Sequence, residues 1–423
     1  MQKNNPLTFF YGVFICLIAG TFYAYEFLLR ILPGAVQSEL MAAFGNISAA
    51  TFGQISALYY FAYSPMQLPV GVLMDRFGPR NILFFSCLIC ALGSWLFAQT
   101  DSLFLVSLGR FLVGFGSAFA FVGMLFLGHN WLPRKFFSLL AGLVTTFAML
   151  SLVFGEVKLA VLPETLGLKT TLLSLAWFGV FLTAIILLFV RDSPEVKKPH
   201  AVLPWDKFFK EVWCVLTDPN VWIIGFIGGA MYTSLSVFGE LWGKVYLQQA
   251  HHLSSIDAAK AVSAIFLGWA VGAPSVGYLS DHTGRRFLPL MVGALLGLII
   301  ISVVIYYPGL NFNMLFTLLF FYGIATSTEI IVFIMGKEWS NTKLAGTVFA
   351  AVNMVVMLVG MFLQPLVGYI LDVSGGAGAL INGHRVFATV DYQRALAVLP
   401  LSLILVLFLL VIFKYFFIKQ QPS

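Results

Sequence analysis

The chain alternates between long apolar runs and short polar turns over most of its 423 residues. Most of the runs have about 20 residues or more, the length that an α-helix needs to cross a bilayer. The twelve runs lie near residues 8–30, 52–74, 81–99, 102–128, 137–161, 168–190, 221–248, 258–280, 287–307, 312–336, 344–371 and 394–418. The pattern therefore predicts an all-α integral membrane protein with twelve transmembrane helices.

The longest polar segment, which begins RDSPEVKKPH at residue 191, divides the runs into two groups of six. We expect an N-terminal six-helix bundle over 1–190, a cytoplasmic linker over 191–220 and a C-terminal six-helix bundle over 221–423. The linker has aromatic residues at helical spacing beside two lysines, which is typical of an amphipathic helix on a membrane surface. These residues are Trp205, Phe208, Phe209 and Trp213, with Lys207 and Lys210.

Composition supports the membrane class and narrows the functions. Hydrophobic residues make up 60% of the chain and charged residues 10%, whereas soluble domains have about 25% charged residues. Lys and Arg concentrate in alternate loops, so the net charge of +6 is interpreted as a topology signal and not as nucleic-acid binding. It predicts that both termini are cytoplasmic, and the short loops favour a bacterial inner membrane.

Several kinds of catalytic chemistry lack their motifs. The sequence contains no GxxxxGK[ST] loop for an ATP-driven pump and no HExxH metal site. Cys87 and Cys90 form a CxxC pair inside an apolar run, where buried small hydrophobic residues are the better interpretation than a metal or redox site. We expect neither an enzyme nor a cofactor.

One polar phrase occurs twice. GVLMDRFGPR at 71–80 follows the second run, and GYLSDHTGRR at 277–286 follows the eighth. At a constant interval, four residues correspond to four others: Gly71, Asp75, Gly78 and Arg80 to Gly277, Asp281, Gly284 and Arg286. The repeat indicates an internal duplication of a six-helix unit.

Both phrases resemble the signature loop G-x-L-x-D-R-x-G-R-[KR] of the major facilitator superfamily of secondary transporters. RFLVGFGSA at 110–118 is similar to the pattern of that family's fourth helix. The resemblance implies two pseudo-symmetric six-helix bundles that alternate in access around a site at the bilayer midplane. It also implies a role for Arg110 in proton coupling or anion binding.

The repeated loops have a physical role that can be stated from their residues. Gly71 and Gly277 allow a neighbouring helix to approach closely. Asp75 and Asp281 stand where a helix ends, so each carboxylate is expected to accept from the N–H groups that begin a helix of the other half. The basic residues that can pair with acids across the same seam are Arg76, Arg80, Arg285 and Arg286. These contacts would close the cytoplasmic side; the alternative is that the charges only anchor the turns at the membrane surface.

Each charged side chain within an apolar run requires a structural or functional explanation, because it costs about 2.5–3.5 kcal/mol at the centre of a bilayer. Glu26 and Arg30 are spaced i,i+4 and are expected to pair, either as a self-satisfied ion pair or as a substrate or proton group. Arg110 needs a partner from another helix or from a ligand. Glu329 has no basic neighbour in its run, which makes it the best candidate for a coupling acid; the alternative is a Glu bonded to the adjacent Ser and Thr.

The other charged and aromatic candidates are less specific. Glu156 and Lys158 are two residues apart and point to different faces of a helix, whereas Glu240 and Lys244 are spaced to pair. Tyr59 and Tyr63 share a face. The aromatic and polar residues that suit a solute cavity, or else ordinary packing, are Tyr23, Tyr59, Tyr63, Tyr232, Trp269 and Asn353.

The sequence therefore predicts a secondary transporter that works by alternating access and is either facilitative or driven by a proton gradient, of which the proton-coupled form is favoured. The segment YYFAYSPMQLPVGVLMDRFGPR at 59–80 resembles organic-anion symporters, and its Tyr-Ser-Pro resembles dipeptide transporters. Both resemblances imply a small carboxylate-bearing solute. The expected partners are this solute and the lipid bilayer, and we expect a monomer that binds no nucleic acid. The alternatives are a substrate sensor built on a transporter fold and an exporter of another class of solute.

Overall fold

The computed structural model describes residues 6–99, 101–133, 137–192, 204–307, 309–340, 342, 344–376, 378–381 and 384–417. Within these residues, eleven helical segments are long and apolar enough to cross a membrane. The predicted class, an all-α membrane protein, is confirmed.

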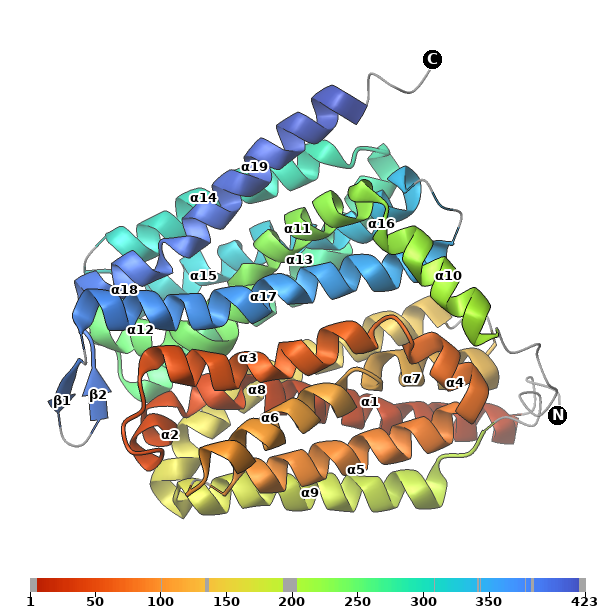
Figure 1. Ribbon diagram of the computed structural model, residues 1–423, viewed down its shortest axis with the longest axis horizontal. Coiled ribbons are helices and arrows are strands. Elements are labelled where there is room, and N and C mark those ends of the chain that lie inside the picture. Colours follow the sequence, from red (N-terminus) through yellow and green to blue (C-terminus); the bar gives the residue numbers. More distant parts are fainter. Residues whose placement is uncertain are drawn as a thin grey trace.

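Helices α1 to α9 form the lower layer of Figure 1. Their bounds are α1 (Pro6–Ala35), α2 (Gln37–Ala43), α3 (Ala49–Met66), α4 (Val70–Phe77), α5 (Pro79–Phe97), α6 (Leu103–Ser117), α7 (Ala120–Trp131), α8 (Phe137–Leu166) and α9 (Leu168–Phe189).

The upper layer follows the linker helix α10 (Trp205–Leu216), which lies at its edge (Figure 1). This layer contains α11 (Pro219–Thr233), the π-helix η3 (Ser234–Trp242), α12 (Gly243–His251), α13 (Ser255–Thr283), α14 (Phe287–Tyr306), α15 (Phe312–Thr326), the 3₁₀-helix η4 (Ser327–Ile330), α16 (Ile331–Trp339), α17 (Ala345–Gly375), α18 (Thr389–Leu396) and α19 (Val398–Phe417). Strands β1 (Ala379–Ile381) and β2 (His384–Val386) pair antiparallel, with Leu380 opposite Arg385.

The two ends of the molecule differ. One end carries the β-hairpin and α2, and we call it the hairpin end; the other carries α4, α10 and both chain ends, and we call it the termini end (Figure 1). The helices before and after the linker lie in different layers in this view. The boundaries 1–190, 191–220 and 221–423 themselves stay a prediction.

Eleven spans, and not twelve, meet the length and hydropathy that crossing requires in the described chain. The predicted run 52–74 is divided between α3 and α4, with a turn over 67–69. Pro69 stands directly before α4, and proline has no N–H to continue a helical hydrogen-bond ladder. The bend expected from Pro65 and Pro69 is therefore present, and the count of twelve stays a prediction.

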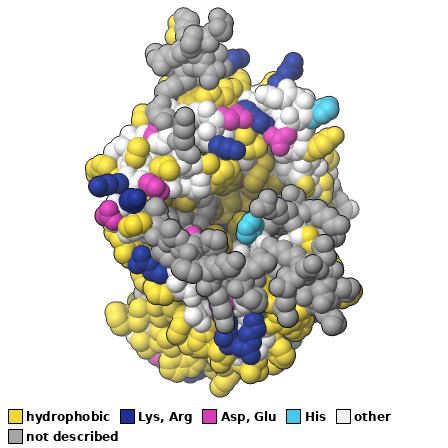
Figure 2. Space-filling model, turned by 90° about the vertical axis from the view of Figure 1, so that its right-hand side faces the viewer, with side chains coloured by type: hydrophobic (Ala, Val, Ile, Leu, Met, Phe, Trp, Pro, Cys, Tyr) yellow, Lys and Arg dark blue, Asp and Glu magenta, His cyan; other side chains and the backbone are white. Residues whose placement is uncertain are grey.

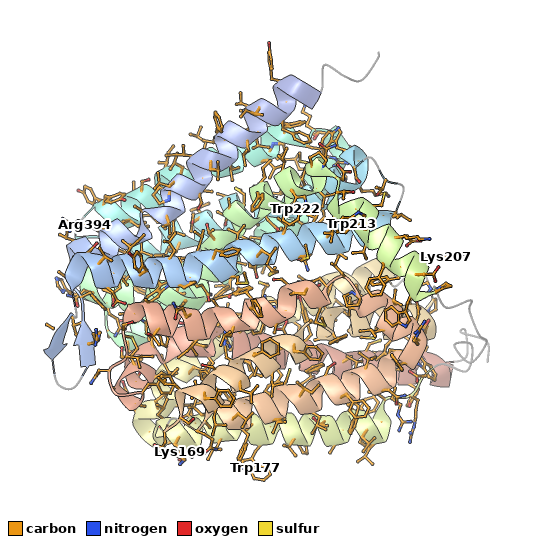
Figure 3. The ribbon with its side chains drawn as sticks, in the orientation of Figure 1. Lys169, Trp177, Lys207, Trp213, Trp222 and Arg394 are labelled. Atoms are coloured by element: carbon orange, nitrogen blue, oxygen red, sulfur yellow. The ribbon has the colours of Figure 1, made fainter. Side chains whose placement is uncertain are left out.

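The predicted amphipathic helix is α10. Phe208 is buried, whereas Phe209 and Trp213 are 63% and 70% exposed, so one face is left for contact with the membrane interface. Lys207 and Trp213 both lie at the outer surface of α10 (Figure 3). The guanidinium of Arg76 lies 4.5 Å from the centre of the Trp205 ring, a cation–π distance that joins α4 to the linker.

The layers contact each other along two antiparallel helix pairs, α3 with α17 and α8 with α13. Glycine permits the close approach of the first pair. A Cβ atom at Gly53 would meet the backbone of Gln364 and Pro365, and one at Gly368 would meet the carbonyl oxygen of Ala49. Cys87 and Cys90 lie buried with free thiols, as expected for small core residues.

We expect Gly368→Val to lower the stability of the protein by about 1–3 kcal/mol, the usual cost of overpacking a well-packed core. The added side chain would force α17 away from α3. Gly346→Val is the matched control on the same helix, because open space surrounds a Cβ at that position. Thermal unfolding in detergent measures both, and equal melting temperatures for the two variants would contradict the packing argument.

Candidate functional site

Arg30 of α1 lies at the seam between the two layers. Its Nε donates to the Tyr59 hydroxyl (3.0 Å) in the lower layer, and its Nη1 donates to the Tyr232 hydroxyl (3.1 Å) in the upper layer. Its Nη2 lies 3.3 Å from both carboxylate oxygens of Glu26. The predicted i,i+4 ion pair of Glu26 and Arg30 is confirmed, and the same guanidinium also connects the two halves of the fold.

Aromatic rings surround this guanidinium. Its carbon lies 4.4 Å from the centre of the Phe27 ring and 5.1 Å from the centres of the Tyr59 and Tyr63 rings. Tyr59 and Tyr63 stack at 5.5 Å, so they share a face as predicted. Tyr23 packs edge-on against Phe27 at 4.9 Å. Ring faces attract a cation, and they make the surroundings of Arg30 suitable for a planar or amphipathic anion.

Arg110 finds its partners on other helices. Its Nε donates to the carbonyl of Ser56 (3.3 Å), its Nη1 to that of Leu29 (2.6 Å) and its Nη2 to that of Arg30 (2.9 Å). Each nitrogen is thus engaged with the backbone of α1 or α3. Arg110 therefore positions the two helices that carry Arg30 and Tyr59.

The expected pairing of Glu240 with Lys244 is wrong. The Tyr60 hydroxyl donates to Glu240 from the opposite layer, and Lys244 donates to the carbonyl of Ala35, also across the seam. Glu240 lies in the π-helix η3, whose turns are wider than those of an α-helix. Spacing i,i+4 therefore does not bring these two side chains together.

Glu329 lies buried in η4. The described part of the chain supplies it with neither a hydrogen bond nor an ion pair. The hydroxyls of Ser327 and Thr328 donate to the carbonyls of Ile324 and Ala325 instead, so the alternative that these neighbours bond to Glu329 is not met.

Two other pathway candidates lie close to this region. Tyr232 and Trp269 meet edge to face at 5.9 Å, and the Trp269 indole donates to the Thr326 hydroxyl just before η4 (3.1 Å). Asn353 donates to Gln67 across the seam (3.0 Å). The structure thus joins Tyr232 and Trp269 to the Arg30 site, whereas Asn353 lies farther towards the termini end.

Glu156 and Lys158 point in different directions, as expected from their spacing. Glu156 is buried and its Oε2 has no hydrogen-bond partner among the described groups, whereas Lys158 is exposed. Glu156 contributes a further buried carboxylate near the seam.

At the termini end, one arginine of each repeated loop bonds within its own layer. In the upper layer, Arg286 pairs with Asp281 (2.7 Å) and with Glu338 of α16 (2.9 Å). The hydrogen bond to Glu338 is the main cause that raises the pKa of the Arg286 guanidinium above its usual value, and Asp281 acts in the same direction. The expectation that Asp281 accepts from a helix of the other half is not met in this conformation, because Asp281 is occupied by Arg286 and is 62% exposed.

The first copy of the loop behaves alike. The Arg80 backbone N–H donates to the Asp192 carboxylate (2.9 Å) and the Arg80 side chain to the carbonyl of Leu187 (3.0 Å). Gly78 and Gly284 both adopt positive φ, +80° and +64°, where glycine is favoured. The Arg285 N–H donates to Thr283.

Among the described residues, the glycines that begin the two loops have no close neighbour. Open space surrounds the positions that a Cβ would take at Gly71 and Gly277, so the close helix contact predicted for these glycines is not made here. Figure 2 views this end and shows exposed Lys and Arg side chains on both layers.

The hairpin end is closed by bonds between the layers. The Asp372 carboxylate, at the end of α17, accepts from the backbone N–H groups of Ala49 (3.0 Å) and Ala50 (2.8 Å), which begin α3. Arg385 of β2 donates to the carbonyl of Asn46 (2.7 Å). Sequence reasoning missed Asp372, although its position directly after the run 344–371 repeats the pattern of Asp75 and Asp281.

A family model described as "Major Facilitator Superfamily" matches residues 9–365 of the chain. The chain belongs to the major facilitator superfamily. It is therefore a membrane transporter of this type and not an enzyme, as the repeated loops predicted.

Individual superfamily members resemble the chain at low identity. The lysosomal dipeptide transporter MFSD1 of Danio rerio is 24% identical over 305 residues, which span 67% of this chain and 64% of that protein. The probable galactarate/D-glucarate transporter GudP of Escherichia coli is 24% identical over 437 aligned positions, 93% of this chain and 94% of the relative. A bacterial homologue of the human lysosomal transporter Spinster, solved in an inward-facing and occupied conformation, has the same fold, with a TM-score of 0.77, 16% identity and coverage of 98% and 99%.

In a major facilitator protein, the bonds at the hairpin end set how readily that end opens. We expect Asp372→Ala to favour opening by about 1.5–3 kcal/mol, the usual contribution of hydrogen bonds to a charged group. Asp372→Asn retains one acceptor oxygen and should have a smaller effect.

Electron–electron distances between spin labels at Thr165 and Val390, in a Cys214→Ser background, measure this opening across the layers. Asp101→Ala, an exposed acid in a turn at the same end, is the control and should leave the distances unchanged. An unaltered distance distribution in Asp372→Ala would show that the carboxylate does not hold this end closed.

Proposed function

We propose that the chain is a proton-coupled secondary transporter of a small solute that carries a carboxylate group. One observation carries the proposal: a buried arginine, Arg30, lies between the two layers and is contacted by both. The named substrates of two relatives, a dipeptide and galactarate or D-glucarate, also carry carboxylates.

The bonds of Arg30 suit an exchange of carboxylates. Its contacts with Glu26 measure 3.3 Å, longer than the roughly 2.7–2.9 Å of strong charge-assisted hydrogen bonds. A solute carboxylate that binds the guanidinium in a fork geometry would take the place of Glu26. Tyr59, which donates to Glu26 (2.8 Å), would then be available to the solute.

The count of buried charges supports proton binding. Asp218 and Asp391 accept from helix-start N–H groups. Apart from these two, the buried Asp, Glu, Lys and Arg side chains of the described residues comprise four acids and three bases: Glu26, Glu156, Glu240 and Glu329 with Arg30, Arg110 and Lys244. If all were charged, the interior would carry one unbalanced negative charge, which is costly away from water. One proton on a glutamate removes this excess.

Glu329 is the best site for that proton. Glu26 is bonded to Arg30 and Tyr59, and Glu240 is bonded to Tyr60. Glu156 lies within electrostatic range of the Lys244 ammonium group, whereas Glu329 has neither a bonded partner nor a neighbouring base in the described chain. Glu329 interacts electrostatically with Tyr232 of α11, which is also bonded to Arg30. Proton loss at Glu329 would therefore change the electrostatic potential at the Tyr232 hydroxyl, which accepts a hydrogen bond from Arg30.

The conformation fits alternating access. The layers are bonded at the hairpin end, while Arg80 and Arg286 of the repeated loops bond within their own layers at the termini end. We take the termini to be cytoplasmic, as the Lys and Arg distribution predicts, so the conformation would be inward-facing. We further propose that the transporter acts as a monomer in a bacterial inner membrane.

Arg30→Lys should retain the charge but lose the planar set of donors, and we expect uptake of the carboxylate solute to fall about 10–100-fold, the equivalent of one lost charge-assisted bond. Arg30→Gln should abolish it. Thermal-shift screening with dipeptides, aldarates and sulfonates identifies a ligand, and uptake into proteoliposomes then measures transport.

Arg394→Gln is the control for Arg30, because Arg394 lies exposed on α18 at the outer surface (Figure 3). Normal uptake by Arg30→Gln would remove the proposed role. A protein that binds the ligand and moves none of it in any reconstitution would instead be a sensor.

Glu329→Gln should uncouple transport from the proton gradient. We expect the variant to exchange labelled for unlabelled solute across the membrane, but to lose accumulation driven by a pH difference, because an amide cannot carry a proton. Glu164→Gln, an exposed acid on α8, is the control. Full pH-driven accumulation by Glu329→Gln would assign the coupling proton to another group.

A further inference from the structure

A second site lies at the lipid-facing side of the seam, away from Arg30. A groove of about 340 Å³ separates α8 of the lower layer from α13 and α15 of the upper layer. Its walls are almost wholly apolar, and its lining residues are Val153, Phe154, Val157, Ser263, Leu267, Phe312 and Phe316, with Lys158 and Lys260. Ser263 offers no free donor, because its hydroxyl donates to the carbonyl of Lys260 (2.7 Å).

The two lysines flank the groove from opposite layers. Lys158 belongs to α8 and Lys260 to α13, and both are exposed. The acid bonded to Lys260 is Asp257, at 3.8 Å, and both side chains of that pair are about half exposed, at 48% and 45%. An exposed pair at this distance is weak. These three groups together leave one net positive charge beside an apolar groove.

The depth of the lysines suits a membrane interface. Lys260 follows the start of α13 by five residues, and Lys158 precedes the end of α8 by eight. At 1.5 Å per residue these positions lie roughly 8 and 12 Å from the hairpin end of their helices. Lysine side chains of this kind extend along apolar surface and place the ammonium group at the level of lipid headgroups.

We propose that this groove binds one anionic phospholipid, with an acyl chain between α8 and α13 and with its phosphate bridging Lys158 and Lys260. The apolar walls match the chain, and the single net positive charge matches one phosphate diester. The phosphate would link one layer to the other at the hairpin end. Such a lipid therefore favours the conformation in which this end is closed.

The test compares phosphatidylglycerol with phosphatidylcholine of the same chains, titrated onto the purified full-length protein and followed by native mass spectrometry. A lysine near a membrane surface contributes about 1 kcal/mol to anionic-lipid binding, or about fivefold in affinity. We expect Lys158→Gln and Lys260→Gln each to weaken phosphatidylglycerol binding about fivefold, and the double variant about 25-fold. Phosphatidylcholine binding should be unchanged in all three.

Two further variants distinguish the contribution of the lipid's acyl chain to binding from that of its headgroup. Val157→Trp fills the groove and should weaken the binding of both lipids. Lys169→Gln should weaken neither, because Lys169 is an exposed lysine of α9 (Figure 3) and does not line the groove. Unchanged phosphatidylglycerol affinity in the double lysine variant would overturn the proposal. Displacement of the lipid by soluble glycerol phosphate at equal concentration would also overturn it, since it would assign the lysines to a soluble anion.

Discussion

The absence of water in the bilayer interior is the constraint on which this structure depends. A buried arginine there must obtain every partner from the protein, and Arg30 obtains its partners from both layers at once. Arg110 in turn bonds the backbone that carries it. The solvation of this one cation is therefore among the contacts that join the two halves of the transporter, and a solute able to replace part of that solvation would act on both halves together.

The carboxylates at the two ends of the seam are paired with different groups. At the hairpin end a carboxylate of one layer accepts from the helix start of the other, which combines hydrogen bonds with the positive end of a helix dipole. At the termini end the carboxylate Asp281 bonds to a guanidinium of its own layer. A carboxylate is the acceptor at both ends, but only the one at the hairpin end bonds across the seam.

Interactions within one helix were predictable from the sequence, and those between helices were not. The apolar runs located the long helices, and the spacing of Glu26 and Arg30 predicted their pair because an α-helix fixes which side chains meet. The same rule failed at Glu240, since a π-helix has another period. The partners Tyr60 and Tyr232 come from distant parts of the chain, and only the packed fold specifies them. The β-hairpin and α2 escaped prediction because neither is apolar or long enough to leave a pattern.

The π-helix η3 interrupts α11 and α12 at the middle of the seam. Each residue of an α-helix turns the chain by about 100°, so absorbing the extra residue of a π turn into regular α geometry would rotate everything beyond it by that amount. Glu240 lies within this segment and Lys244 just after it, and both bond to the opposite layer. Rewinding η3 would thus release both contacts in a single step. A change of winding within η3 would also rotate one part of this helix against the other, with neither a proline nor a break in the chain.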